Sequence, residues 1–275
     1  MKTTITGNDR SFISWSELKS YGGLFRYLSL RDVMVRYKQT WIGFGWSIIR
    51  PLINIVIFGS LSFLVDKTGS FSERFVEVSG AVVFWQLLAT CITEVSNSLT
   101  NNANILTKVY FPKVLLPLSS LLVCLVDFLI AFVIFLIVFM VFRGLPPWQI
   151  VLLPVFVLYG LVFAFAFGLL AATASVKYRD VRFILPFIVQ ILFYASPVFL
   201  KSSFVLALNL PEWLRVLYQI NPLVFILNGF KYCLYGNFEA FTMLGAVSSV
   251  CITGVLLFVA LRYFLKFEKS FADYI

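Results

Sequence analysis

The sequence predicts an all-α integral membrane protein with six transmembrane helices, an N-terminal amphipathic interface helix and short re-entrant outer helices before the last span. Two observations support this fold class. Of the 275 residues, 60% are hydrophobic and only 13% are charged, whereas a soluble domain carries about 25% charged residues. Several apolar runs also reach the roughly 20 residues that a helix needs to cross a bilayer. Backbone that faces lipid must be helical to satisfy its polar groups.

Six apolar runs are predicted to span the membrane. They cover about 46–65, 78–95, 114–142, 150–176, 183–200 and 244–265. The third run exceeds a hydrocarbon core of about 30 Å, so it must tilt or project from the bilayer. The predicted organisation is a cytoplasmic N-terminus with the interface helix (1–45), spans one to five (46–200) with cytoplasmic loops (96–113 and 177–182), an outer re-entrant gate segment (201–243), and the last span with a cytoplasmic tail (244–275).

The segment 201–243 decides between six and seven spans. It holds two moderately apolar stretches, around 204–210 and 216–235, and the second is a candidate seventh span. A seventh span would move the basic tail RYFLKFEKS to the outside. With six spans and both termini cytoplasmic, most of the 22 basic residues lie inside, as the positive-inside rule requires. We therefore expect a re-entrant or interfacial pair of short helices in this segment.

Residues 24–38 are too charged to span and suit a helix that lies in the membrane interface. One half of the helical wheel is apolar, with Leu24, Tyr27, Leu28, Leu30, Met34, Val35 and Tyr37, and the other half carries Arg26, Ser29, Asp32 and Arg36. Arg31 and Lys38 depart from this pattern. They either snorkel to ordinary headgroups or, together with Arg36, bind the phosphate of an anionic lipid substrate.

Charge and missing motifs exclude several function classes. The net charge is +9 without any histidine, but membrane proteins concentrate Lys and Arg in cytoplasmic loops, so the excess does not indicate nucleic acid. The sequence has no GxxxxGK[ST] phosphate loop, so ATP hydrolysis by that route is not expected. GxSxG and HExxH motifs are also missing. We expect no catalytic residue and no metal site.

Asp127 is the one acid deep in a predicted span. Intramembrane acids are costly and therefore point to a function. A proton-coupled transporter would use such a residue, but proton relays usually chain several acids or histidines. Helix packing or pairing is the favoured interpretation, and proton coupling is the alternative.

Five blocks in order resemble the polysaccharide permeases of the type-2 ABC exporter class, which serve O-antigen, capsule and teichoic-acid export. The first block, 31–63, matches the family in Arg36-Tyr37-Lys38, Gly43, Trp46 and Pro51. The others are NANILTKVYFPKVLLPLSS (102–120), KYRDVR (177–182), Ser196-Pro197-Val198 and NPLVFILNGFKYCLYG (221–236). Lys231 stands where arginine is expected in many relatives. The resemblance covers nearly the whole chain.

The resemblance implies a permease subunit in the bacterial inner membrane that exports an undecaprenyl-pyrophosphate-linked polysaccharide. It implies a homodimer with two copies of a separate ABC ATPase subunit, which would carry the ATP and Mg; no cofactor is expected in this chain. This implication agrees with the missing phosphate loop.

The loop between spans two and three is the predicted contact with the ATPase subunit. Two aromatics and a proline end a helix rigidly beside basic residues, in Lys108, Tyr110, Phe111, Pro112 and Lys113. The alternative is a plain interface anchor of aromatic and basic residues. Arg179 and Asp180 are predicted as a second, smaller contact.

Two further sets of residues are candidates along the transport path. Tyr159, Phe163 and Phe167 recur at i, i+4 and i+8 and form one stripe, which either packs in the protein or lines a conduit along which sugar rings slide on aromatic faces. From the resemblance, Pro197, Asn221, Pro222 and Gly229 are predicted to belong to an outer gate.

Three other functions stay open at this point. A secondary transporter would show internal repeats and several intramembrane charges, and neither is seen. A membrane-embedded glycosyl- or acyltransferase would need an acid or base cluster facing a cavity. A permease of the same ABC class for a drug, a small lipid or another amphipath is the alternative that the sequence separates least well.

Overall fold

The computed structural model describes residues 19–38, 45–65, 70–108, 111–199, 201–208, 211–237, 242–268 and 271, and every regular element in these ranges is helical. The elements are α2 (Gly22–Lys38), α3 (Gly45–Val65), α4 (Phe71–Asn101), α5 (Ala103–Lys108), α6 (Leu115–Arg143), η1 (Trp148–Leu152), α7 (Leu153–Lys177), α8 (Val181–Tyr194), α9 (Ser202–Ala207), α10 (Glu212–Ile220), α11 (Pro222–Tyr235) and α12 (Met243–Phe267).

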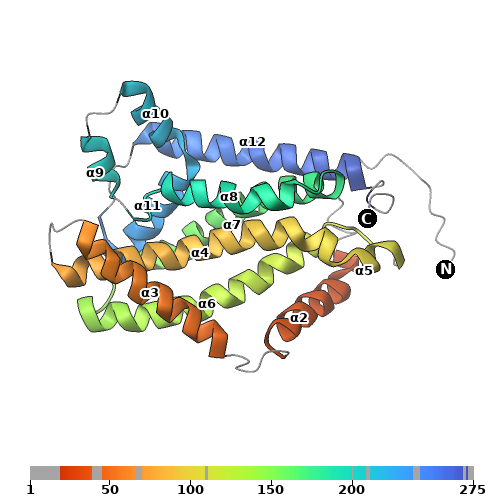
Figure 1. Ribbon diagram of the computed structural model, residues 1–275, viewed down its shortest axis with the longest axis horizontal. Coiled ribbons are helices and arrows are strands. Elements are labelled where there is room, and N and C mark those ends of the chain that lie inside the picture. The colour runs from red at the N-terminus through yellow and green to blue at the C-terminus, as the bar shows by residue number, and fades with distance from the viewer. Residues whose placement is uncertain are drawn as a thin grey trace.

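The long helices run between two ends of the molecule (Figure 1). The end that carries α5 and the last turn of α12 is called the α5 end. The opposite end carries α9, α10 and α11 and is called the α11 end. Helix α2 lies obliquely beside α6, towards the α5 end (Figure 1).

Five of the six predicted spans correspond to helices, whereas the fifth, 183–200, is helical only to Tyr194 and continues as a turn over 195–198. The all-α membrane fold is confirmed. Within the described residues, four helices are long and apolar enough to cross a membrane: Phe71–Asn101, Leu115–Arg143, Trp148–Lys177 and Met243–Phe267. The other two predicted spans correspond to the shorter apolar helices Gly45–Leu61 and Val181–Tyr194. Because the 14 residues of α8 extend only about 21 Å, less than the bilayer core, the number of six spans stays a prediction.

Helix α4 is the centre of the bundle. In its most apolar stretch 83% of the residues are buried, against 22% for α12, and α4 packs against α3, α6 and α7. Gly160 and Gly168 of α7 allow the close approach to α4, since a Cβ at these positions would lie 2.9 Å from Leu88 and 2.8 Å from Val95. Small residues at such crossings are typical of membrane helices, where packing replaces the hydrophobic effect.

The buried apolar residues form two clusters. The larger one joins α4, α6, α7 and α11, and its centre is the stacked pair Phe84 and Phe230, with ring centroids 4.2 Å apart. The second cluster lies towards the α5 end, where Leu28 of α2 and Phe111 meet Phe264 of α12 and Phe271. The second cluster therefore holds the interface helix, the loop after α5 and the C-terminal segment together.

The segment 201–243 forms three short helices instead of the expected pair. Helices α9, α10 and α11 replace two apolar stretches. The second stretch divides at Asn221, whose side chain accepts a hydrogen bond from Leu223 N and caps α11, with Pro222 as the first helical residue. This cap and proline start a new helix where hydropathy alone suggests continuity.

Candidate functional site

Helix α2 turns Ser29, Asp32 and Arg36 of its polar half towards the rest of the protein, while Arg26 is exposed. Tyr27, Leu30, Met34 and Val35 are exposed, whereas Asp32 and Arg36 contact other helices. Leu28 of the apolar half is buried as well, so the two halves are not cleanly separated, and the placement of the exposed apolar side chains in the membrane interface stays a prediction.

An ion network joins the end of α2 to α4 and α6. The Arg36 guanidinium pairs with Asp127 of α6 through Nη1 and with Glu94 of α4 through Nη2. The Tyr37 hydroxyl donates a hydrogen bond to the other oxygen of Asp127. Asp127 and Glu94 are the acids that the sequence places within spans, and both are partners of the same arginine. This geometry favours helix pairing as the role of Asp127.

The same contacts fix the protonation of the α2 groups. Burial and the hydrogen bond to Asp127 raise the pKa of Tyr37 to about 12, so its phenol stays protonated and donates. For Arg36, burial disfavours the charge, but the carboxylates of Asp127 and Glu94 outweigh it and raise the pKa. The guanidinium is therefore permanently charged in this network.

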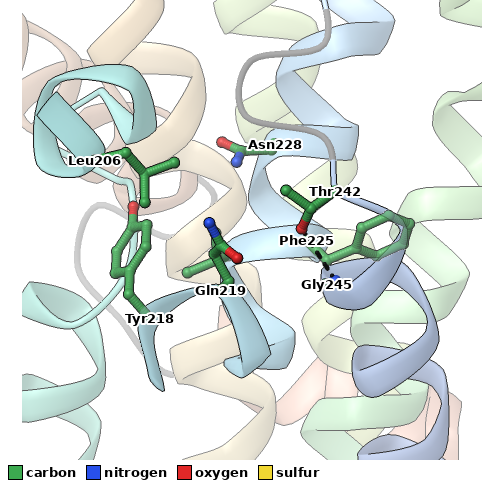
Figure 2. Close-up of a pocket in the computed structure, with 8 residues that line it drawn as sticks. Leu206, Tyr218, Gln219, Phe225, Asn228, Thr242 and Gly245 are labelled. Carbon is green, nitrogen blue, oxygen red and sulfur yellow. Dashed lines mark hydrogen bonds between the residues drawn. The ribbon is translucent and has the colours of Figure 1, made fainter. Parts of the chain in front are cut away.

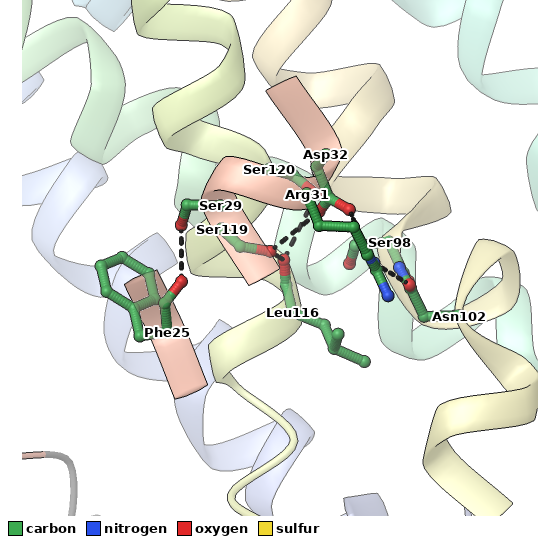
Figure 3. A network of polar contacts seen from close by, with 9 residues as sticks. All are labelled: Phe25, Ser29, Arg31, Asp32, Ser98, Asn102, Leu116, Ser119 and Ser120. Atoms are coloured by element: carbon green, nitrogen blue, oxygen red, sulfur yellow. Dashed lines mark hydrogen bonds and ion pairs between the residues drawn. The ribbon is translucent and has the colours of Figure 1, made fainter. Parts of the chain in front are cut away.

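A second network holds the middle of α2 (Figure 3). Arg31 donates through Nη2 to Asp32 Oδ1 and to Asn102 Oδ1, both at 2.6 Å. Ser119 of α6 donates to the other Asp32 oxygen at 3.3 Å, and Asn102 donates to Ser98 O at 2.9 Å. Of the three predicted lipid-phosphate residues, Arg31 and Arg36 thus contact protein groups, while Lys38 is exposed. Phosphate binding stays a prediction.

The loop after α5 is anchored inside the protein. Phe111 is only 4% exposed and lies in the second cluster. Lys113 donates from its backbone N–H to Glu268 Oε1 at 2.9 Å and from Nζ to Glu268 O at 2.6 Å. Pro112 is half-buried between them. These contacts fix the loop to the C-terminal end of α12.

Exposed charges surround that anchor at the α5 end. Lys108, Arg179 and Asp180 are all exposed, with Arg179 and Asp180 in the turn between α7 and α8. Tyr110, also predicted as an ATPase contact, lies outside the described residues. The arrangement suits docking of a soluble partner on a rigid loop, and the contact itself stays a prediction.

The predicted conduit stripe packs within the chain. Tyr159 shares hydrogen bonds with Ser249 at 2.6 Å and Thr253 at 3.3 Å on α12. Phe163 is buried and Phe167 packs against the first cluster. Exposed aromatic rings lie instead on α8, where Phe183, Phe187 and Tyr194 follow one face. Sequence spacing did not single out this face, although 183, 187 and 194 fit one helical side.

The predicted outer-gate residues meet at the α11 end. Asn221 donates from Nδ2 to Ala195 O at 3.1 Å, in the turn that contains the buried Pro197, and Pro222 starts α11. Gly229 allows α11 to pack on α7, since a Cβ there would lie 1.9 Å from Phe156 Cε1. The segment after α8 is therefore fastened to the start of α11, and a gating role stays a prediction.

Glu77 of α4 is a charged centre that the sequence analysis missed. Its side chain is 11% exposed and pairs with Lys231 of α11 at 3.5 Å, with Lys201 at 3.2 Å and with Arg74 at 3.6 Å. The pairs connect α4 to the start of α9 and to α11. Lys231 was the sequence feature that could have revealed this centre, because a lysine inside an apolar stretch needs a carboxylate partner.

Within the described ranges, no group of three His, Cys, Asp or Glu side chains is placed to hold a metal ion.

Most of the chain is similar in sequence to known proteins. The family described as ABC-2 type transporter matches residues 23–235. The chain is 27% identical over 261 residues to the O-antigen export system permease protein RfbA of Myxococcus xanthus, which covers 94% of this chain and 97% of that relative. It is 27% identical over 253 residues to a Klebsiella pneumoniae protein of the same name, with 88% and 91% covered.

Proposed function

The chain belongs to the ABC-2 type transporter family, and from this premise we propose that it is the permease subunit of an ATP-driven exporter of O-antigen or a similar polysaccharide. The observation that carries the proposal is the match to O-antigen export permeases over 94% of this chain. The cargo is an undecaprenyl-pyrophosphate-linked glycan, which crosses the bacterial inner membrane.

The subunit works as a homodimer with two ABC ATPase subunits, which bind ATP and Mg. In this arrangement the α5 end and both termini face the cytoplasm. The exposed Lys108, Arg179 and Asp180 meet the ATPase subunits, and the loop that carries Phe111 and Lys113 transmits their motion. The anchoring of that loop to Glu268 and to the second cluster supports this role, because a rigid contact moves the helices behind it.

The lipid phosphate meets α2 at the cytoplasmic surface of the bilayer. Lys38 is exposed beside the apolar outer face of α2, where a lysine can reach both headgroups and water. Arg31 and Arg36 hold the helix in place through Asn102 and Asp127, so Lys38 is the residue of the three that is available for direct contact.

The glycan passes along aromatic side chains. Two surfaces compete for this role: the stripe of Tyr159 and Phe167 on α7, which packs against the chain's own helices, and the exposed Phe183 and Phe187 on α8. The exposed face of α8 is the better candidate for contact with the glycan. A second copy of the chain can approach this face without displacing side chains from the existing core.

Deletion of the gene tests the proposal. We expect lipid-linked polymer to accumulate inside the cell and to reach the surface again when the chain is restored. Surface display of the polymer without the chain would refute glycan export. If deletion leaves the polymer unchanged but redistributes another membrane lipid, the chain is a permease for that lipid instead. Before the deletion is made, an ATPase gene next to the gene for this chain, within a cluster of glycosyltransferase genes, would support glycan export.

A further inference from the structure

Arg50 of α3 is an exposed charged side chain that lies outside the ion networks described above. Trp46, Ile53 and Ile57 are also exposed, and their spacing from Arg50 places all four residues on one side of the helix. In a membrane protein such an apolar side meets lipid or another membrane helix. Arg50 therefore carries a permanent charge within an apolar surface.

Among the described residues, no carboxylate pairs with Arg50. Its guanidinium instead lies over the Trp46 ring, with Cζ 5.9 Å from the ring centroid. Because Trp46 is one turn nearer to the start of α3, this contact holds the charge towards that end of the helix. An exposed cation on a membrane helix is costly without an anion, so the position suits an anionic ligand from outside the chain.

The start of α3 lies against the end of α2. The Tyr37 hydroxyl shares a hydrogen bond with Ser47 of α3, and Figure 1 shows the two helix ends beside one another. Lys38, which is proposed above to meet the lipid phosphate, directly follows Tyr37, and Trp46 directly precedes Ser47. Lys38 and the Arg50 guanidinium therefore belong to one region, which is called the α2–α3 junction.

The α2–α3 junction has an excess of positive charge. Arg36 is shared by two carboxylates, so its network has one net negative charge. Lys38 and Arg50 add two positive charges, and the segment 39–49 between them contains no charged residue. One net positive charge is left at the junction, and this charge favours an anion.

We propose that Arg50 and Lys38 together bind the pyrophosphate of the lipid-linked glycan at the α2–α3 junction. The inference rests on the proposed export of that glycan. A pyrophosphate offers its oxygens to two cations at once, and the planar guanidinium binds a phosphate through two parallel hydrogen bonds. The exposed Ile53 and Ile57 beside Arg50 provide an apolar surface for the lipid tail.

A carboxylate from a second copy of the chain is a weaker candidate for the partner of Arg50. In the ranges that the structure describes, the exposed acids are Glu73, Asp180 and Glu212. They lie at the two ends of the bundle, where α4 and α10 begin and where α7 meets α8 (Figure 1). The junction is level with Asp127, about 18 Å along α6 from its start. A two-fold axis along the bilayer normal keeps each residue at its own height, so these acids would not reach Arg50.

The hollow between α10, α11 and the start of α12 is not an alternative phosphate site (Figure 2). It has room for about one water molecule, and the residues that line it are uncharged. Its buried Asn228 amide is already hydrogen-bonded to Ser202, with Nδ2 to Oγ at 2.9 Å. A phosphate would find neither space nor a cation in this hollow.

Binding of radiolabelled undecaprenyl pyrophosphate, which carries no glycan, tests the inference. The probe is titrated against the full chain with its ATPase subunit, purified in detergent. Arg50→Gln should weaken binding about tenfold, the size of one charge-assisted hydrogen bond. Arg50→Lys keeps the charge but loses the planar fork, so it should retain part of the affinity. Because Arg50 is exposed, both variants should keep the thermal midpoint of the unchanged chain.

Arg26→Gln is the matched control, since it removes an exposed arginine of α2 away from the junction. It should leave probe binding unchanged. An equal loss in Arg26→Gln and Arg50→Gln, or no loss in Arg50→Gln, overturns the pyrophosphate site.

Competition separates the two possible sources of the phosphate. Phosphatidylglycerol, an ordinary lipid with one headgroup phosphate, should displace the probe about tenfold less effectively than unlabelled undecaprenyl pyrophosphate does, because it satisfies only one of the two cations. Equal displacement would show that Arg50 binds ordinary headgroups and would overturn the site. The deletion experiment separates the two proposals. Internal accumulation of polymer with probe binding that does not depend on Arg50 refutes only the junction site, whereas no accumulation refutes glycan export and the cargo site together.

Discussion

Arg36 of the interface helix forms an ion pair with Asp127 of α6, a residue 91 positions away in the sequence. The pair gives the intramembrane acid a permanent counter-charge and fixes the end of α2 to the bundle. Glu94 shares the same guanidinium. The interface helix is therefore attached to two membrane helices by charge as well as by the burial of Leu28.

A double-mutant cycle measures this attachment. Arg36→Ala and Asp127→Ala should each destabilise the purified chain in detergent by about 1–2 kcal/mol, because the first leaves Asp127 and Glu94 without their shared cation and the second leaves Arg36 with Glu94 alone. The double variant should lose less than the sum of the two. Thermal unfolding gives the values. Arg26→Ala, an exposed arginine on the same helix, is the control and should change little; additive losses would show that the two residues do not interact.

Replacing the carboxylate of Glu77 should loosen the α11 end. Glu77→Gln leaves Lys201, Lys231 and Arg74 without this counter-charge, and breaking such a buried pair costs about 3–5 kcal/mol. Glu73→Gln is the control, since Glu73 is largely exposed and pairs with Arg143 at 3.3 Å, so its loss should cost less than about 1 kcal/mol. Proteolysis between α8 and α11 reports the loosening. Equal protection in both variants would contradict the role of Glu77.

Lys38 should contribute to export without contributing to the fold. Lys38→Glu places a negative charge where the lipid phosphate is proposed to bind, so polymer export should fall severalfold while membrane insertion and the thermal midpoint stay unchanged. Pulse labelling of surface polymer measures the rate. Arg26→Glu makes the same charge change on an exposed position of α2. If both variants export at the same rate, Lys38 only snorkels to headgroups.

Charge reversal at the α5 end should weaken the ATPase contact. Lys108→Glu combined with Arg179→Glu changes two exposed charges, so the ATPase subunit should co-purify in smaller amounts, most clearly at low salt, because exposed charges are screened as salt rises. Lys113→Glu should act differently and lower the thermal midpoint, since Lys113 holds Glu268. Unchanged co-purification of the double variant would place the ATPase contact elsewhere.

Hydropathy predicted the helices well because each long apolar run must become a helix in lipid. The runs at 46–65 and 244–265 match α3 and α12 within two residues at each end. Helix α4 begins earlier than predicted, at Phe71, because Arg74 and Glu77 neutralise one another and enter the buried helix despite their charges.

The sequence pattern could not predict the side-chain contacts on which the roles of Arg36, Phe111 and Tyr159 depend. The position of Arg36 on the polar half of an interface helix is compatible with contact to water, to phosphate or to Asp127. Only the three-dimensional packing determines which of these Arg36 contacts. Phe111 looks like an exposed docking aromatic in sequence, but the fold buries it in the second cluster. Tyr159 likewise meets Ser249 only because α12 returns beside α7.

The most direct test of glycan export is transport in a defined membrane. The purified chain and its ATPase subunit are placed in vesicles with a lipid-linked glycan, and an enzyme that cannot cross the bilayer reports on which side the glycan lies. We predict that ATP moves the glycan away from the ATPase side, and that vesicles with the ATPase alone show no movement. A glycan that stays on its original side while ATP is hydrolysed would contradict the proposed function.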